Sequence, residues 1–351
     1  MEASGTGVFE ADGVEVVAET EASTLDAPAR RWASGWRALL LRPETGLPAI
    51  LLLLCVYLSI SSQYFLQYQN LLNITEAVAV VGIAAAFATI VVIGGGIDLT
   101  PVTVMVTSGI VCLHALNLGL PIPIVVLLAL AASGGIGLVN GGLIAIGGLN
   151  PFIVTLGTNF LFTGIAYVAT DGNSQLISNV SFSKIGQSQL PGRIPVSTAI
   201  MVGVFVLGFF LLRATRFGTH VFAVGGGEDA ARLSGVRVRD VKIRLYVLSA
   251  MSAGLAGVVQ ASAGGSVAPY AASSSNDLLT ILAAVIIGGT ALTGGRGSIV
   301  GTLVGILLLG TIANGLVLKN ISSFYQPVVT GAILLIAIVL DETRRRLQPA
   351  R

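Results

Sequence analysis

The chain has 351 residues, of which 54% are hydrophobic and 10% are charged, and its formal net charge is +2. Soluble domains carry about 25% charged residues, so this composition excludes an ordinary soluble protein. Its apolar runs are continuous and do not alternate, which excludes a membrane β-barrel. We therefore expect an all-α polytopic membrane protein, in which about 20 apolar residues cross the bilayer in each span.

The N-terminal segment differs from the rest of the chain. Residues 1–29 hold seven acidic residues and no basic one, a composition too polar to fold alone, so we predict a disordered cytoplasmic tail. The segment also lacks the basic start of a cleavable signal peptide. Residues 30–45 form a basic juxtamembrane segment, 46–342 the transmembrane permease domain, and 343–351 a basic cytoplasmic tail.

Proline, glycine and charged clusters divide the domain into about ten transmembrane helices. The expected spans are 46–66, 73–94, 100–118, 122–146, 151–170, 195–213, 244–263, 277–293, 298–318 and 324–341.

Basic residues set the expected orientation. They cluster before the first span, in the loop 214–243 after the sixth, and after the last. Lys and Arg in short loops mark the cytoplasmic side. Ten spans put all three clusters on that side, so both termini are predicted to be cytoplasmic in a multi-pass protein of the plasma (inner) membrane.

Small residues and weak repeats mark the helices. Glycines and alanines spaced by four, in 137–145 and 297–305, predict close helix contacts. The stretch 140–157 resembles 314–331 with opposite orientation, a possible inverted repeat. Residues 90–100 resemble 283–293 with the same orientation. The two pairs imply different offsets, so at most one reflects a duplication.

The loop 214–243 contains the most charged interior stretch. Glycines bracket residues 226–235, which we predict to form a short helix with an i,i+4 pair between Glu228 and Arg232 and with Gly235 as the residue after its C-cap. So short a helix needs a packing partner. Ala230 and Leu233 form an apolar stripe that favours a docking surface, and the alternative is a solvated linker.

Several stretches in order resemble one family. They are "NLLNI" (70–74), "GGGIDLT" (94–100), "NPFIVTLGTNFLFTGI" (150–165), "ATRFGTHVFAVGGGEDAARLSGVRVRDVKI" (214–243), "AAVIIGGTALTGGRGSIVGTLVG" (283–305) and "SSFYQPVVTGAILL" (322–335). This set is similar to the permease subunits of bacterial ABC monosaccharide importers of the ribose, xylose and galactose type, in the branched-chain amino acid and simple sugar permease family. The resemblance covers about residues 46–342.

The resemblance implies a non-catalytic transport subunit with three protein partners. They are a second permease copy, a cytoplasmic ATP-binding cassette ATPase, and an extracytoplasmic sugar-binding protein; membrane lipid surrounds the subunit, and no nucleic acid is involved. The short helix is then a coupling helix seated on the ATPase, with Gly226, Gly227, Glu228, Ala230, Ala231, Arg232, Leu233, Ser234 and Gly235 as its residues. The chain has no phosphate-binding loop, so ATP hydrolysis is expected on a partner subunit.

Polar residues in or beside the spans are candidates for the substrate path. A neutral sugar needs hydrogen-bonding groups, and the candidates are Asn73, Asp98, Thr100, Asn140, Asn159, Asn276, Asn314 and Gln326. Buried amides also hold helices together, and Asp98 could instead cap the helix that follows it or brace its loop.

Two other function classes are alternatives to the permease. An ion-coupled secondary transporter of a small polar solute needs ionisable residues in mid-membrane, and the interior has few. A membrane enzyme or scaffold needs a catalytic cluster or a large soluble domain. The sequence shows no catalytic arrangement, metal site or cofactor motif, and it leaves open which sugar or related solute is carried.

Overall fold

The computed structural model describes residues 43–274, 276–322 and 324–347. The predicted tail 1–29, most of the juxtamembrane segment 30–45 and the end of the tail 343–351 lie outside the described residues. The elements in chain order are α2 (Pro43–Ser61), α3 (Tyr68–Ile93), α4 (Pro101–Asn117), α5 (Ile122–Ala145), α6 (Pro151–Ala169), β1 (Gln175–Leu176), α7 (Val180–Gln187), β2 (Gln189–Leu190), β3 (Ile194–Pro195), α8 (Val196–Ala214), α9 (Arg216–Gly226), α10 (Glu228–Leu233), α11 (Val238–Gly264), β4 (Ser266–Val267), α12 (Ala271–Ser274), α13 (Asp277–Ile287), α14 (Ile299–Leu318) and α15 (Tyr325–Leu347).

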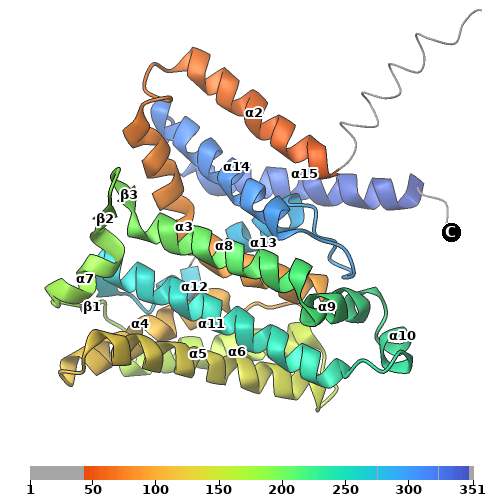
Figure 1. Cartoon of the computed structure of the whole chain (residues 1–351). Helices are drawn as coiled ribbons and strands as arrows, with labels where there is room; N and C mark the ends of the chain where they lie inside the picture. Colours follow the sequence, from red (N-terminus) through yellow and green to blue (C-terminus); the bar gives the residue numbers. More distant parts are fainter. Residues whose placement is uncertain (1–42, 275, 323, 348–351) are drawn as a thin grey trace, which may run out of the picture. The chain divides into compact units, whose positions relative to one another are not determined.

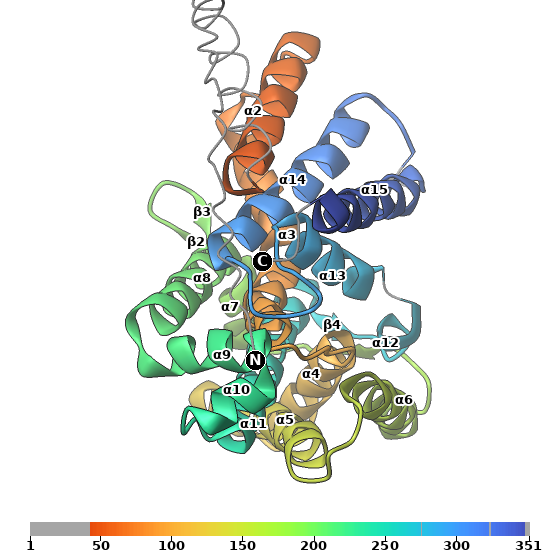
Figure 2. The same cartoon turned by 90° about the vertical axis from the view of Figure 1, so that its right-hand side faces the viewer.

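The long helices carry different structures at their two ends (Figure 1). Short strands and α7 gather at one end, which we call the α7 end, and α9 and α10 lie at the opposite end, the α10 end. The strands form two antiparallel pairs, β1 with β4 and β2 with β3. Figure 2 looks onto the α10 end. This arrangement separates the charged segment 226–235 from the polar loops between α6 and α8.

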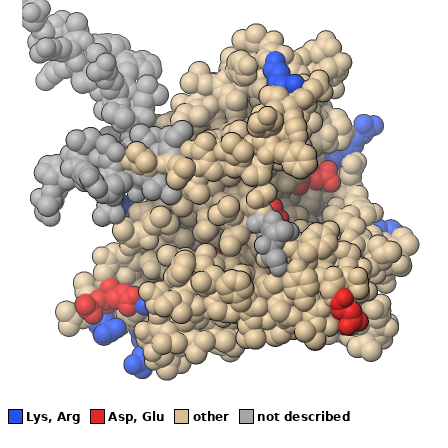
Figure 3. All heavy atoms as spheres, turned by 180° about the vertical axis from the view of Figure 1, so that it is seen from behind, with Lys and Arg blue, Asp and Glu red and all other residues tan. Residues whose placement is uncertain are grey.

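Ten apolar helices account for the predicted spans. Within the described residues, six helices are long and apolar enough to cross a membrane, and four shorter apolar helices accompany them at Gly46–Ser61, Pro101–Asn117, Asp277–Ile287 and Tyr325–Leu335. On the face seen in Figure 3, acidic and basic side chains gather mostly at the margins, and a wide uncharged area lies between them. The structure is thus an all-α polytopic membrane protein, as predicted.

The predicted span 277–293 is shorter than expected. Helix α13 ends at Ile287, and its 11 residues are followed by the loop 288–298. At a rise of about 1.5 Å per residue, α13 covers about half of the hydrocarbon thickness. Two adjacent glycines cause the stop, because each disfavours helix by about 1 kcal/mol and Gly289 adopts a left-handed conformation with φ of 85°.

Helix α11 lies at the centre of the bundle and packs against α3, α4 and α5. A Cβ atom on Gly141 of α5 would lie 2.8 Å from the backbone of Ile243 in α11, and one on Gly305 of α14 would lie 2.5 Å from the carbonyl oxygen of Ala284 in α13. These glycines therefore let backbones meet, which confirms the predicted close contacts along 137–145 and 297–305.

The proposed inverted repeat has the expected orientations. The loop after α5 lies at the α10 end, since Gly141 contacts the start of α11. The loop after α14 lies at the α7 end, where the Lys319 ammonium donates to the carbonyl oxygen of Ser61 at 3.1 Å. Whether the two stretches arose by duplication stays a prediction.

Candidate functional site

The charged segment at the α10 end folds as two helices instead of one. Thr215 caps α9, its hydroxyl accepting from the N–H of Gly218 at 3.3 Å. Gly227 then breaks the helix with an extended backbone, and α10 follows. The sequence predicts one helix over 226–235 and gives no signal for α9, because α9 contains three glycines and three β-branched residues, all weak helix formers.

Helix α10 ends as predicted. Gly235 has φ of 82°, its N–H donates to the carbonyl of Arg232 at 3.0 Å, and the N–H of Val236 donates to the carbonyl of Ala231 at 3.0 Å. These two bonds form a Schellman motif, which needs a left-handed residue after the C-cap and so favours glycine. The Ser234 hydroxyl donates to the carbonyl of Ala230 at 2.9 Å and completes the C-terminus.

The apolar side chains of α10 divide between two faces. Ala231 is 4% exposed and joins the central core, whereas Leu233 is 90% exposed. Ala230, predicted as part of the apolar stripe, is also exposed. The Leu233 side chain is therefore accessible to another molecule, whereas Ala231 is not.

The predicted ion pair between Glu228 and Arg232 is wrong. Glu228 instead pairs with Lys242 of α11, and Arg232 lies 3.7 Å from Asp229 in an exposed i,i+3 pair. The Lys242 side chain is mostly buried, whereas that of Arg232 is largely exposed. Glu228 therefore pairs with Lys242 of the neighbouring helix and not with Arg232 of its own helix. Lys242 lies in the basic loop 214–243, from which the sequence predicts only the orientation in the membrane, and no local signal reveals this contact.

The buried carboxylate of Asp98 braces the loop between α3 and α4. Asp98 is 3% exposed, and its Oδ1 accepts from the N–H of Thr100 at 2.9 Å and from the Thr100 hydroxyl at 2.6 Å. Its Oδ2 accepts from the Ser249 hydroxyl of α11 at 2.9 Å. Thr100, not Asp98, is the N-cap of α4. The Asp98 carboxylate therefore braces the loop and does not cap the helix.

Three predicted substrate-path amides pair neighbouring helices. Asn140 of α5 accepts from the Thr158 hydroxyl of α6 at 2.7 Å, and Asn159 of α6 accepts from the Thr103 hydroxyl of α4. Asn314 of α14 and Asn70 of α3 exchange two hydrogen bonds, at 2.8 and 3.1 Å. Each amide has its partner on another helix, an arrangement that holds helices together.

The remaining candidates are not gathered around one cavity. Asn73 accepts from Gln69 within α3 at 3.1 Å, Asn276 precedes α13, and Gln326 lies in α15. Asn140, Asn159 and the Asp98–Thr100 pair belong to the elements around α4, whereas Asn73 and Asn314 lie near the start of α3. Six of the candidates thus fall into two polar groups, and Asn276 and Gln326 belong to neither.

The Asn70–Asn314 pair allows a test of whether such amides hold helices together or contact the transported sugar. Replacing both residues with leucine is expected to destabilise the protein by about 1 kcal/mol, the typical worth of an interhelical hydrogen bond, and to leave the sugar concentration for half-maximal uptake unchanged. Denaturant unfolding in detergent and an uptake titration measure the two quantities. A large rise in the half-maximal concentration without loss of stability would instead place the pair in the substrate path.

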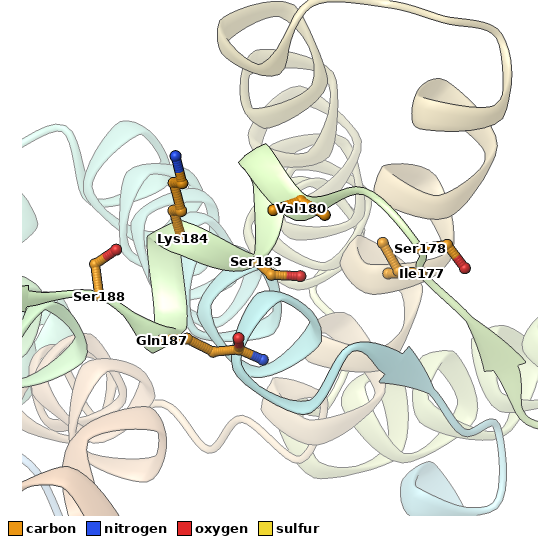
Figure 4. A pocket seen from close by; sticks show the side chains of 7 residues that line it. All are labelled: Ile177, Ser178, Val180, Ser183, Lys184, Gln187 and Ser188. Carbon is orange, nitrogen blue, oxygen red and sulfur yellow. The ribbon is translucent and has the colours of Figure 1, made fainter.

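The α7 end carries a hollow over α7 (Figure 4). It is lined by Ile177, Ser178, Val180, Ser183, Lys184, Gln187 and Ser188. Asn179 caps α7, accepting from the N–H of Phe182 at 2.9 Å, and Phe182 is fully buried against α11. Among the described residues, no group of His, Cys, Asp or Glu is arranged to hold a metal ion.

The chain matches the model of the family described as branched-chain amino acid transport system / permease component, over residues 70–338. It is 40% identical to the ribose import permease RbsC of Bacillus subtilis over 84% of this chain and 91% of that protein. It is 35% identical to RbsC of Escherichia coli K12, over 87% and 95% of the two chains. It is 34% identical to the L-arabinose ABC transporter permease AraH of Azospirillum brasilense, over 91% and 92%. No solved structure matches the chain.

Proposed function

Since the chain belongs to the branched-chain amino acid transport system / permease component family, we propose that it is the permease subunit of an ATP-driven importer that moves a monosaccharide into the cytoplasm. Relatives named as ribose, L-arabinose and D-allose permeases span most of this chain. They support the importer over the ion-coupled secondary transporter that the sequence left open. Ribose is the first sugar to test.

The observation that carries the mechanism is the exposed Leu233 on a helix held firmly against the bundle. Ala231 anchors α10 in the core, and the Lys242–Glu228 pair fixes it to α11. We infer that α10 is the coupling helix and that Leu233 inserts into a cleft of a cytoplasmic ATPase. A rigid helix can then transmit the closure of two ATPase subunits as a rigid-body motion.

The orientation follows from charge. The α10 end carries the basic loop 214–243, and such loops face the cytoplasm. We therefore place the α10 end and both termini in the cytoplasm, and the α7 end, with its hollow beside Lys184, outside. A sugar-binding protein docks at the α7 end, and a second permease copy completes the pathway. We place ATP hydrolysis on the separate ATPase.

Reconstitution tests this function directly. Proteoliposomes that contain the permease and its ATPase, with the sugar-binding protein outside, are expected to accumulate labelled ribose or another aldose only when ATP is enclosed. Vesicles without ATP but with a sodium or proton gradient are the matched control. Uptake driven by the gradient alone would contradict the proposal and favour the secondary transporter.

A further inference from the structure

Three glycine segments from distant parts of the sequence meet at the α10 end. They are Gly95 in the loop after α3, Gly225 in α9, and Gly294 with Gly295 in the loop 288–298; we call these four residues the glycine junction. The loop after α3 lies within the first stretch of the weak repeat, 90–100. Gly294 and Gly295 follow the second stretch, 283–293, so the repeat does not by itself account for the contact. Neither the coupling surface nor the polar candidates explain this junction.

The contacts in the glycine junction are made by backbone atoms. The N–H of Gly295 donates to the carbonyl oxygen of Ile93 at 2.8 Å. A Cβ atom on Gly294 would lie 2.8 Å from the carbonyl oxygen of Gly225 and 2.8 Å from the Cα atom of Gly95. A Cβ atom on Gly225 would overlap the Ile93 carbonyl oxygen. No side chain separates α9 from the two loops at these points.

Backbone conformation also requires glycine in two of the three segments. Gly95, Gly294 and Gly295 have φ between 74° and 80°, the left-handed region that other residues rarely adopt. Gly225 differs, because its backbone is helical. A side chain is excluded there only because a Cβ atom would overlap the carbonyl oxygen of Ile93. It is therefore the position at which a substitution changes the contact without straining its own backbone.

The loop 288–298 is itself rigid and tied to two helices. The N–H of Ala291 donates to the carbonyl of Arg296 at 3.0 Å, and the N–H of Gly294 donates to the carbonyl of Ala291 at 2.9 Å. On either side of the loop, α13 and α14 pack backbone to backbone, since a Cβ atom on Gly288 would lie 2.6 Å from the backbone of Gly301 and Thr302. A displacement of the loop must carry α13 and α14 with it, because packed backbones do not deform continuously.

Helix α13 is shorter than a full membrane span. It covers only about half of the membrane thickness, so the loop 288–298 fills the rest of its path toward the α10 end. The coupling helix α10 begins one residue beyond Gly227, and α9 ends at Gly226, so α10 and the glycine junction are directly continuous along the chain.

Resting on the proposed function, we propose that the glycine junction transmits the motion of the coupling helix to the α13–α14 hairpin, residues 277–318, and that this hairpin changes access to the sugar path. Gly225 is a positioning residue in this scheme. It touches neither sugar nor ATPase, and it sets the distance at which α9 engages the loop.

The Gly225→Ala variant tests the proposal. Its methyl group pushes the loop 288–298 and the end of α3 away from α9, so the number of sugar molecules moved per ATP hydrolysed is expected to fall at least about tenfold, within the usual range of coupling free energies. ATP hydrolysis and copurification with the ATPase are expected to persist, because the exposed face of α10 is unchanged. Gly142→Ala is the matched control, a glycine at the α10 end of α5 where a Cβ atom meets nothing within 4 Å.

The outcomes separate the two proposals. If wild-type protein moves no sugar with ATP, the proposed function fails. If the wild type transports and Gly225→Ala keeps the same ratio of sugar to ATP as Gly142→Ala, or loses both activities in parallel, the glycine junction does not transmit the motion.

Hydrogen exchange on the wild-type complex gives a result that does not depend on the folding of a variant. The amides of Ala291, Gly294 and Gly295 donate hydrogen bonds within the loop and to the end of α3. They are expected to stay protected both without nucleotide and with a non-hydrolysable ATP analogue, because α9 and the loop move as one body. Loss of protection in either state would show that the junction opens during the cycle and would overturn the proposal.

Discussion

Replacing Leu233 with aspartate is expected to abolish ATP-driven uptake while the protein still inserts and folds. Leu233 is 90% exposed and makes no core contact that folding needs. In the proposed complex its side chain is buried in the ATPase, and placing an unpaired carboxylate there costs about 3 kcal/mol, or about a hundredfold in affinity. Copurification of the ATPase and uptake in proteoliposomes measure the loss.

The controls for this variant distinguish docking from general damage. Leu233→Met keeps the apolar volume and is expected to retain copurification. Leu118→Asp introduces the same charge at another exposed leucine that ends a helix, at the α7 end, and is expected to leave ATPase binding intact. If Leu233→Asp copurifies and transports like the wild type, α10 is not the docking surface.

Replacing Asp98 with alanine is expected to destabilise the bundle by about 3 kcal/mol, because three donated hydrogen bonds lose their acceptor inside the protein. These are the N–H and hydroxyl of Thr100 and the hydroxyl of Ser249. The carboxylate joins the loop between α3 and α4 to the central helix α11. Its loss therefore weakens the packing of α3, α4 and α11. Denaturant unfolding in detergent measures the change in the free energy of unfolding.

The Asp98→Asn variant distinguishes a structural role of Asp98 in the loop from a role of its carboxylate in transport. The amide keeps one acceptor for Thr100 and can donate to the Ser249 hydroxyl, which also accepts. We expect it to recover most of the stability and of the uptake lost in Asp98→Ala. If Asp98→Asn is stable but moves no sugar, the carboxylate acts in transport and loop bracing is only part of its role.

Much of the site could be predicted where the signal is local. Gly235 was assigned to the C-terminus of α10 because a left-handed residue there favours glycine, and the Schellman bonds confirm it. Ala230 and Leu233, the stripe interpreted as a docking surface, are both exposed, and the docking itself stays a prediction. The pairing of Glu228 failed, since an i,i+4 ion pair is worth only about 0.3–0.5 kcal/mol and Lys242 of α11 competes for the same carboxylate.

The polar candidates show the same limit. Asn140, Asn159 and Asn314 could be recognised as unusual in apolar helices, but their partners come from other helices. Asn314 and Asn70, for example, are 244 residues apart in the sequence. Spacing along one helix contains no information about such a partner. The sequence could single out polar residues in or beside the spans, but of these Asp98, Thr100 and Asn140 are buried whereas Asn73 and Asn276 are exposed. It also could not say which of them face each other.

The sequence by itself determined the class of structure, because long runs without charge can lie only in lipid or in a large core. It also placed most ends of the long helices, because glycine and proline act through their own backbones. Only the tertiary structure decided that α13 is half-length, that Asp98 holds α4 to α11, and that the glycines after α3, in α9 and after α13 touch. The physical reason is that these contacts join segments up to about 200 residues apart, and their free energy comes from close packing that no local pattern records.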